Sequence, residues 1–446
     1  MTSRPDPPEA SRRERMIRKI ASLMVRGVYR RVEVYRAPAD LSGDPQLSVS
    51  NHFGGFADPL LLIYAMPRVP RIIARDVIWK IPVARSVMKW VRAIPVHKRE
   101  DKGPGSNDVM FASAYEALEE RSHLMIFPEG ITRDEPSIAP IKTGAARIAL
   151  GARASGVDGI EITPAGIHYE NKAALRSDVS VLVGPPLDLD AAVEQLVPAG
   201  EDAGPANRAL VRSLTDDIER RLRHVAPDFS DWEEARTLTR GAEMLLRSVA
   251  DDPAAPVPVA ARDYVAGYLG RKPDDEKRQI TEAIETYGDA LSDLDITDAQ
   301  LQSGMTGRRF LWRLIGWLVL SVVLLPFAVV GVLVNWIPFL VVKAVGLLRV
   351  APAVLATLKP ISAILAFGLA WGVVGWGAFR DFGASGAALA LLLMPVYLAA
   401  VIVLTERVQT LWTAFRAWRG LSRSARADDI IEVQRREAIS ALSEAL

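Results

Sequence analysis

Short apolar runs alternate with longer amphipathic stretches between residues 32 and 228. The short runs are rich in valine, isoleucine and leucine, as buried strands are, whereas the longer stretches carry apolar residues every three or four positions, as helices do. The predicted strands are Val32–Tyr35, Leu47–Ser50, Pro70–Ala74, Ile94–His97, His123–Phe127, Glu161–His168 and Val179–Val183. The predicted helices are Asp58–Ala65, Ile81–Val91, Asp108–Arg121, Thr143–Ala154 and Asn207–His224. This alternation predicts an α/β domain with a central mixed sheet over residues 32–228.

The segment before this domain, residues 1–31, begins with a polar tail that we expect to be disordered. From Ser11 to Arg31 the apolar residues share one helical face, and most of the basic residues lie elsewhere. A basic amphipathic helix of this kind suits an anionic membrane surface. It also suits a helix that packs on the α/β domain and keeps its basic face in solvent, and the sequence leaves both interpretations open.

A charged segment without β-branched runs follows the α/β domain, at residues 229–309. Helix-start signals occur near Asp231, Asp274 and Thr297. The pattern predicts a small, soluble, helical segment. No catalytic pattern stands out in it, and we interpret it as a structural spacer or a docking surface.

Residues 310–406 are the most apolar part of the chain and predict C-terminal transmembrane helices. The runs Ile361–Phe379 and Ala387–Thr405 are nearly uncharged and long enough to cross a bilayer as helices. The earlier run, Leu311–Leu348, is interrupted by prolines and by the turn-like Asn335–Pro338. We interpret this run (311–348) as a broken hydrophobic hairpin, which makes either two crossings or a re-entrant loop.

Basic residues lie at both ends of this membrane domain. Arg308 and Arg309 precede it, and the tail at 407–446 is rich in arginine. The positive-inside rule then places both ends in the cytoplasm, which requires an even number of crossings. We therefore expect a multi-pass protein of the cell membrane, with the α/β domain on the cytoplasmic side and a basic cytoplasmic tail.

The composition limits the types of catalytic and metal-binding site that the chain can contain. The chain has 446 residues, of which 50% are hydrophobic, and its net charge is +1. It contains no cysteine, which excludes cysteine nucleophiles, disulfides and Cys-ligated zinc. The five histidines are scattered along the chain, so we expect no metal site, and we expect no nucleic-acid partner.

A histidine and a carboxylate lie on one short loop directly after a predicted strand. His52 and Asp58 are separated by five residues, and Gly54 and Gly55 give this loop the freedom to bring the carboxylate back to the imidazole. The carboxylate would then hold one ring nitrogen while the other takes a proton from a hydroxyl. The alternative is an ordinary helix cap, in which Asp58 precedes Pro59 at the first helical position.

A second block, Phe127–Arg133, follows another predicted strand. An arginine can hold a phosphate through two hydrogen bonds, and the nearby helix start adds backbone donors and a favourable dipole. Glu129 either contacts a substrate hydroxyl or is a buried structural carboxylate. The candidate substrate-binding residues of this region are Glu129, Gly130, Thr132, Arg133 and Lys142.

With two further blocks, these motifs resemble the membrane glycerolipid acyltransferases, the family of lysophosphatidate and glycerol-3-phosphate acyltransferases. The further blocks are Ile94–Arg99, which is basic, and Ile162–Ile167, which contains a proline. The four blocks follow the family's order and cover roughly residues 30–225. The long spacing from His52 to Asp58 is similar to that of the fungal-type glycerol-3-phosphate and dihydroxyacetone-phosphate acyltransferases.

The resemblance implies acyl transfer from acyl-CoA or acyl carrier protein to the hydroxyl of glycerol 3-phosphate or 1-acylglycerol 3-phosphate, at a membrane, in phospholipid synthesis. It implies no cofactor and no covalent enzyme intermediate. His52 would be the base and Asp58 its partner, and Arg133 with Lys98 or Arg99 would hold the acceptor phosphate. Two alternatives stay open: another lyso-lipid acceptor, such as a lyso-ornithine lipid or a lyso-glycolipid, and a non-catalytic lipid-binding scaffold.

Overall fold

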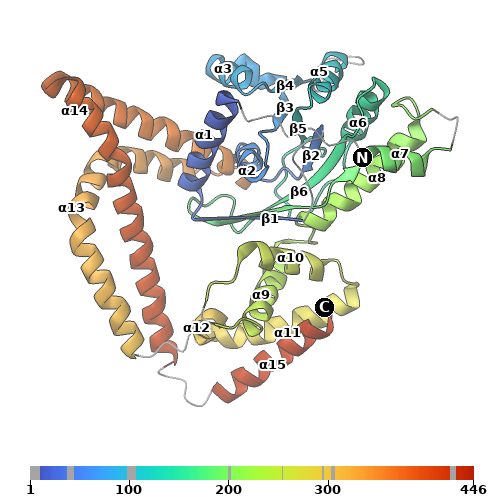
Figure 1. Cartoon of the computed structure of the whole chain (residues 1–446). Helices are drawn as coiled ribbons and strands as arrows, with labels where there is room; N and C mark the ends of the chain where they lie inside the picture. Colours follow the sequence, from blue (N-terminus) through green and yellow to red (C-terminus); the bar gives the residue numbers. More distant parts are fainter. Residues whose placement is uncertain are drawn as a thin grey trace. The chain divides into compact units, whose positions relative to one another are not determined.

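The computed structural model describes residues 11–37, 45–97, 107–198, 202–253, 255–293, 296–302, 307–421 and 428–446. The chain divides into two compact units. The first comprises residues 1–235 and 258–271, and the second comprises residues 236–257 and 272–446. Figure 1 shows a sheet with helices in the first unit and helices alone in the second.

An eight-stranded mixed sheet forms the centre of the first unit. Its strand order is β1-β7-β6-β2-β5-β3-β4, and β8 pairs with β6. Strands β6, β2, β5, β3 and β4 run parallel to one another, whereas β7 runs antiparallel to β6. The bounds are β1 (Arg31–Arg36), β2 (Gln46–Ser50), β3 (Arg71–Arg75), β4 (Ile94–Val96), β5 (His123–Ile126), β6 (Glu161–Tyr169), β7 (Asp178–Val183) and β8 (Leu187–Asp188). The predicted α/β class and all seven predicted strands are confirmed.

Helices cover both faces of this sheet, because successive strand residues point to opposite sides. Leu47 and Val49 of β2 lie in a core cluster with helices α5 (Asp108–Glu119), α6 (Gly144–Ala154) and α8 (Arg208–Val225). On the other face, Met125 and Ile167 pack against α1 (Arg12–Val28) and α2 (Ala57–Ala65). The remaining helices of this unit are η1 (Asp76–Lys80), α3 (Pro82–Trp90) and α7 (Leu189–Leu196).

Helix α1 is therefore part of the α/β unit rather than a separate segment. Ile17, Ala21 and Val25 are buried on its inner face, and Arg18 donates to the carbonyl of Met66 at 2.8 Å. Of the two interpretations that the sequence allows, packing on the domain is confirmed.

Helix α10 (Val259–Gly270) also belongs to the α/β unit, although the sequence pattern assigns it to the separate segment 229–309. Asp263 accepts a hydrogen bond from Ser180 of β7 at 2.6 Å, and Glu33 of β1 accepts one from the backbone of Ala260 at 2.9 Å. These long-range bonds fix α10 on the sheet, and local sequence patterns carry no signal for them.

The second unit contains α11 (Asp274–Asp293), α12 (Asp298–Gln302), α15 (Asp428–Glu444) and most of α9 (Trp232–Ser248). Asp298 joins all four of these helices: it lies in α12, pairs with Arg247 of α9 at 3.3 Å and with Arg435 of α15 at 2.7 Å, and accepts a hydrogen bond from Tyr287 of α11 at 2.7 Å. The predicted basic tail thus includes a folded helix, whose Ala438 and Leu442 are fully buried.

Two helices in the second unit are long and apolar enough to cross a membrane. They are α13 (Gly307–Gly346) and α14 (Pro352–Leu421), which pack against each other. The predicted helices 361–379 and 387–405 both lie within α14, and its backbone breaks at Gly383, inside the predicted link.

The predicted hairpin within 311–348 is wrong, because α13 continues through Asn335–Pro338 as helix. The Asn335 side chain, which is fully buried, donates to the carbonyl of Gly331 at 2.8 Å and accepts from Trp371 of α14 at 2.8 Å. Asn335 therefore supplies a polar contact between helices instead of a turn, as polar residues do within a membrane.

Two glycines of α13 provide a test of this packing. A Cβ atom at Gly331 would collide with the backbone carbonyl of Tyr397, whereas Gly316 has open space around it. Gly331→Ala should therefore lower the thermal unfolding midpoint of the detergent-solubilised protein. Gly316→Ala should leave the midpoint unchanged or raise it, because alanine stabilises a helix interior by about 0.5–1 kcal/mol relative to glycine. Equal effects of the two variants would contradict the described contact between α13 and α14.

Candidate active site

The loop after β2 brings His52 and Asp58 together at the carboxyl end of the sheet. The Nδ1 atom of His52 lies 2.7 Å from Oδ2 of Asp58. Asp58 is the second residue of α2 and is completely buried, whereas the His52 side chain is 22% exposed. Because Nδ1 is engaged by the carboxylate, Nε2 is the ring nitrogen left to exchange a proton with another group. The geometry is that of an oriented general base rather than of a helix cap.

Asp58 accepts further hydrogen bonds from two other groups. The backbone nitrogen of Gly54 lies 2.9 Å from Oδ2, and the hydroxyl of Tyr169 donates to Oδ1. A side chain at Gly54 would collide with Tyr169, so this glycine is required by the close approach of the tyrosine. The buried carboxylate is thus surrounded by donors, which offset the cost of removing its charge from water.

Tyr169 is a site residue that the sequence patterns miss. It is the last residue of β6, which runs parallel to β2, so its side chain and the His52 loop meet at the same edge of the sheet. Burial, followed by the nearby charge of Asp58, raises the pKa of Tyr169 well above its ordinary value, and the hydroxyl stays protonated as a donor. The only available signal is its place at the end of the block that contains Pro164.

Glu129 connects the two sequence blocks through backbone contacts. Its Oε1 accepts from the nitrogen of His52 at 3.0 Å, and its Oε2 accepts from the nitrogen of Ala139 at 3.0 Å. The side chain is 2% exposed, and burial raises its pKa. Both carboxylate oxygens thus accept hydrogen bonds from main-chain nitrogens and brace the two loops.

The ring of His52 stacks on Phe127, with 4.2 Å between the ring centroids and 18° between the ring planes. The backbone nitrogen of Arg133 donates to the carbonyl of His52 at 3.3 Å. The Asp58 carboxylate and the Phe127 ring therefore hold the imidazole, and main-chain hydrogen bonds hold the backbone of His52. This restraint keeps Nε2 in one direction.

The candidate phosphate-binding residues lie on the same loop. Gly130 has a φ of +68°, and a side chain there would meet the amine of Lys142. Thr132 is exposed, and the Arg133 guanidinium forms an ion pair with Glu135. Gly130, Thr132, Arg133 and Lys142 are thus brought together near His52.

Lys172 anchors this loop from the opposite side. Its amine lies 2.6 Å from Asp134 and donates to the carbonyl of Arg133 at 3.1 Å. It also lies over the rings of Phe53 and Trp232, at 5.9 and 5.5 Å from their centroids. The sequence patterns do not single out Lys172, because its partners are distant in the chain.

Lys98 and Arg99 lie outside the described residues. The residue before them, His97, follows β4 and pairs with Asp76 at 2.8 Å. Because β3 and β4 are parallel to β5, this pair lies at the same carboxyl edge of the sheet as His52. The described part of the chain holds no cluster of three or more His, Asp or Glu residues that would suit a metal ion.

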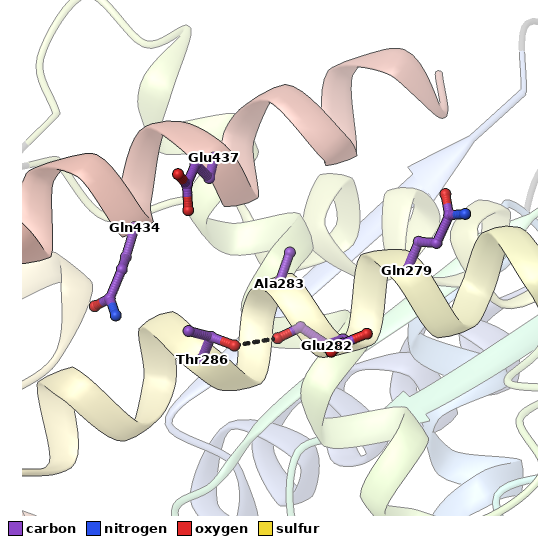
Figure 2. A pocket seen from close by; sticks show the side chains of 6 residues that line it. All are labelled: Gln279, Glu282, Ala283, Thr286, Gln434 and Glu437. Carbon is purple, nitrogen blue, oxygen red and sulfur yellow. Dashed lines mark hydrogen bonds between the residues drawn. The ribbon is translucent and has the colours of Figure 1, made fainter.

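A hollow in the second unit is of a different character. It lies between α11 and α15, and Figure 2 shows the side chains that line it. They are Gln279, Glu282, Ala283, Thr286, Gln434 and Glu437. This lining contains no histidine and no cationic side chain. It therefore lacks both the base and the candidate phosphate-binding residues that lie at the carboxyl edge of the sheet.

Comparison with known proteins matches the part of the chain that carries these residues. The family model described as Acyltransferase matches residues 29–168, which include His52, Asp58 and the Phe127–Arg133 block. The chain contains an acyltransferase-family domain. The match ends at His168, one residue before Tyr169.

Two curated relatives come from Saccharomyces cerevisiae. Glycerol-3-phosphate O-acyltransferase 1 is 27% identical over 191 residues, which is 42% of this chain and 25% of the relative. Glycerol-3-phosphate O-acyltransferase 2 is 26% identical over 228 residues, which is 51% of this chain and 30% of the relative. The matched part of the chain thus spans less than a third of either relative.

Among solved structures, the chain is similar to the 1-acyl-sn-glycerophosphate acyltransferase PlsC from Thermotoga maritima. The TM-score is 0.34 and the sequence identity 18%, over 47% of this chain and 77% of that one.

The contact between Tyr169 and Asp58 leads to a prediction for catalysis at this candidate site. Tyr169→Phe removes one donor to the carboxylate but keeps the ring beside Tyr29, so kcat/KM should fall about tenfold to a hundredfold. The carboxylate then interacts more strongly with the imidazolium, so the acidic limb of the pH–rate profile should move to higher pH.

Tyr29→Phe is the comparison variant, because the ring and hydroxyl of Tyr29 contact Tyr169, while no hydrogen bond from Tyr29 to Asp58 is found among the described residues. Its pH–rate profile should move less than that of Tyr169→Phe. A merely structural Tyr169 would lower the unfolding midpoint in the Tyr169→Phe variant and leave the acidic limb where it is in the wild type.

Proposed function

We propose that the protein transfers an acyl group from an acyl thioester to the hydroxyl of glycerol 3-phosphate or 1-acylglycerol 3-phosphate. The observation that carries the proposal is the His52–Asp58 contact of 2.7 Å, which lies on the same edge of the sheet as the Arg133 loop. A base beside a cation suits a substrate in which a hydroxyl and a phosphate lie a few bonds apart. The names of the two yeast relatives support the same substrate class.

In this mechanism, Nε2 of His52 takes the proton of the acceptor hydroxyl as its oxygen attacks the thioester carbonyl. The C–S bond then breaks, the acyl group remains on the acceptor oxygen, and the imidazolium returns the proton to the departing thiolate. Asp58 keeps the imidazole in the required tautomer and stabilises its cation. The chain has no cysteine, and the mechanism forms no covalent bond to the enzyme.

The acceptor phosphate binds Arg133 in this proposal and replaces the carboxylate of Glu135 as its partner. Lys142, whose amine lies next to Gly130, adds a second positive charge, and Lys98 or Arg99 is proposed as a third. Acyl-CoA or acyl carrier protein is the proposed donor. The two membrane-length helices support a multi-pass protein of the cell membrane, and we propose that its catalytic unit faces the cytoplasm.

The base is tested by His52→Ala and Asp58→Asn in the purified protein. Loss of a positioned base should reduce kcat by about two to four orders of magnitude, and loss of its orienting anion should be similarly severe. The measurement is product formation with acyl-CoA and each acceptor, beside the unfolding midpoint of each variant. Near-wild-type turnover by a folded His52→Ala protein would refute the mechanism.

The phosphate site is tested by Arg133→Ala. It should raise the KM of the acceptor at least about tenfold and leave the KM of the donor nearly unchanged, because the arginine contacts only the phosphorylated substrate. Arg133→Lys should recover only part of the affinity, since an ammonium group cannot form the paired hydrogen bonds of a guanidinium.

Glu135→Gln is the matched control for this position. It removes the carboxylate that competes with the phosphate, so the KM of the acceptor should fall or stay constant. Equal increases in both KM values in Arg133→Ala would indicate a structural arginine, and an unchanged acceptor KM would indicate a phosphate-free lyso-lipid acceptor.

A further inference from the structure

Lys172 is a buried cation to which the mechanism above gives no role. Its side chain is 5% exposed, and its amine lies 2.6 Å from the carboxylate of Asp134. The amine also donates to the backbone carbonyl of Arg133 at 3.1 Å. A buried charge is stable only when it is paired and hydrogen-bonded, so removing either contact is unfavourable. Lys172 therefore holds the main chain at the residue that is proposed to bind the acceptor phosphate.

The turn that carries Lys172 is itself fixed. It connects β6 to β7, and the carbonyl of Asn171 accepts a hydrogen bond from the hydroxyl of Ser177 across the turn at 2.9 Å. Arg176 ties the same turn to the end of α1, because its guanidinium donates to the carbonyl of Tyr29 at 2.9 Å. The amine of Lys172 thus extends from a restrained backbone and transmits that restraint to the Arg133 loop.

Tyr169 and Lys172 lie three residues apart and hold opposite halves of the candidate site. Tyr169 donates to Asp58, whose carboxylate orients the imidazole of His52. Lys172 holds the backbone of Arg133. The base and the phosphate-binding cation are therefore both positioned from one short segment, Tyr169–Lys172.

Two aromatic residues complete the surroundings of the Lys172 amine. Phe53 directly follows His52, and its ring lies under the amine, as an aromatic face does when it stabilises a cation. Trp232 provides the second ring, and its indole nitrogen donates to the carbonyl of Asp134 at 2.8 Å. The amine thus contacts the chain neighbours of both His52 and Arg133.

We propose that Lys172 is a positioning residue that sets the separation between the base and the phosphate-binding arginine, and thereby decides which hydroxyl of the acceptor is acylated. It acts through Arg133 and does not contact the substrate. The two hydroxyls of glycerol 3-phosphate lie on neighbouring carbons, at different numbers of bonds from the phosphate. With the phosphate held by Arg133, a fixed separation presents one of them to Nε2 of His52, and a displacement of about 1 Å is enough to change the rate about a hundredfold. This role of Lys172 rests on the proposed function.

Two acceptors with a single hydroxyl measure this selectivity in the full-length protein. 3-Hydroxypropyl phosphate keeps only the primary hydroxyl of glycerol 3-phosphate, and 2-hydroxypropyl phosphate keeps only the secondary one, so acyl migration between hydroxyls cannot obscure the result. For a lysolipid acceptor, 1-acylglycerol 3-phosphate and 2-acylglycerol 3-phosphate form the corresponding pair. Lys172→Met removes the charge and keeps the length of the side chain. Lys277→Met is the matched control, because Lys277 pairs with Asp274 at 3.0 Å in the second unit.

The wild type should prefer one acceptor of the pair, and Lys172→Met should reduce the ratio of the two kcat/KM values about fivefold or more while the KM of the donor stays nearly constant. Lys172→Arg should restore part of the ratio, because a guanidinium can pair with Asp134 and donate to the carbonyl of Arg133. Asp134→Asn should change the ratio in the same direction, and adding it to Lys172→Met should have little further effect, since both act through one contact. Lys277→Met should leave the ratio unchanged.

Hydrogen–deuterium exchange of the backbone provides a second readout that does not require turnover. Residues 130–136 should exchange faster in Lys172→Met than in the wild type or in Lys277→Met, because their anchor is lost. Unchanged exchange there would overturn the positioning role of Lys172, whatever reaction the protein catalyses. A lower unfolding midpoint with an unchanged ratio of kcat/KM values would also overturn it and would make Lys172 a structural residue. A wild type that acylates none of these phosphorylated acceptors would instead refute the proposed function.

Discussion

The buried carboxylate of Asp58 is the constraint on which the candidate site depends. A completely buried anion is stable only when several donors surround it, and here those donors come from the imidazole of His52, the backbone of Gly54 and the hydroxyl of Tyr169. Two of these donors, His52 and Gly54, lie in the loop after β2, and the third, Tyr169, lies at the end of β6. The hydrogen bonds that stabilise the Asp58 charge therefore also fix the direction of the His52 imidazole.

A second buried carboxylate connects parts of the chain that are far apart in sequence. Glu129 holds the backbone of His52 and of Ala139, and this joins the first block to the loop that precedes α6. Burial raises the pKa of Glu129, while the two backbone donors favour its charged form. Glu129 thus holds the two loops in place. The two blocks lie close together because the parallel strands β2 and β5 end side by side.

The periodicity of apolar residues was sufficient for seven strands of the α/β unit and for α1, α2, α3, α5, α6 and α8, because each is a local pattern that burial on a sheet requires. The short elements β8, η1 and α7 were not predicted. His52 and Asp58 could be paired from sequence because they share one loop. Tyr169 and Lys172 could not, since their roles depend on where β6 ends relative to β2. The hairpin in α13 was inferred from Asn335 and Pro338, whose helix-breaking tendency is outweighed by the contact between Asn335 and Trp371.

Helix α10 gives the α/β unit a discontinuous sequence. The chain leaves this unit after residue 235, returns for residues 258–271, and leaves again. The hydrogen bonds of Ser180 with Asp263 and of Glu33 with Ala260 form only after that return. During synthesis from the N-terminus, β1 and β7 must therefore wait, with one face uncovered, until Gly270 has left the ribosome. Completion of the sheet is thus coupled in time to synthesis of a segment that follows every strand and precedes α11 to α14 in the chain.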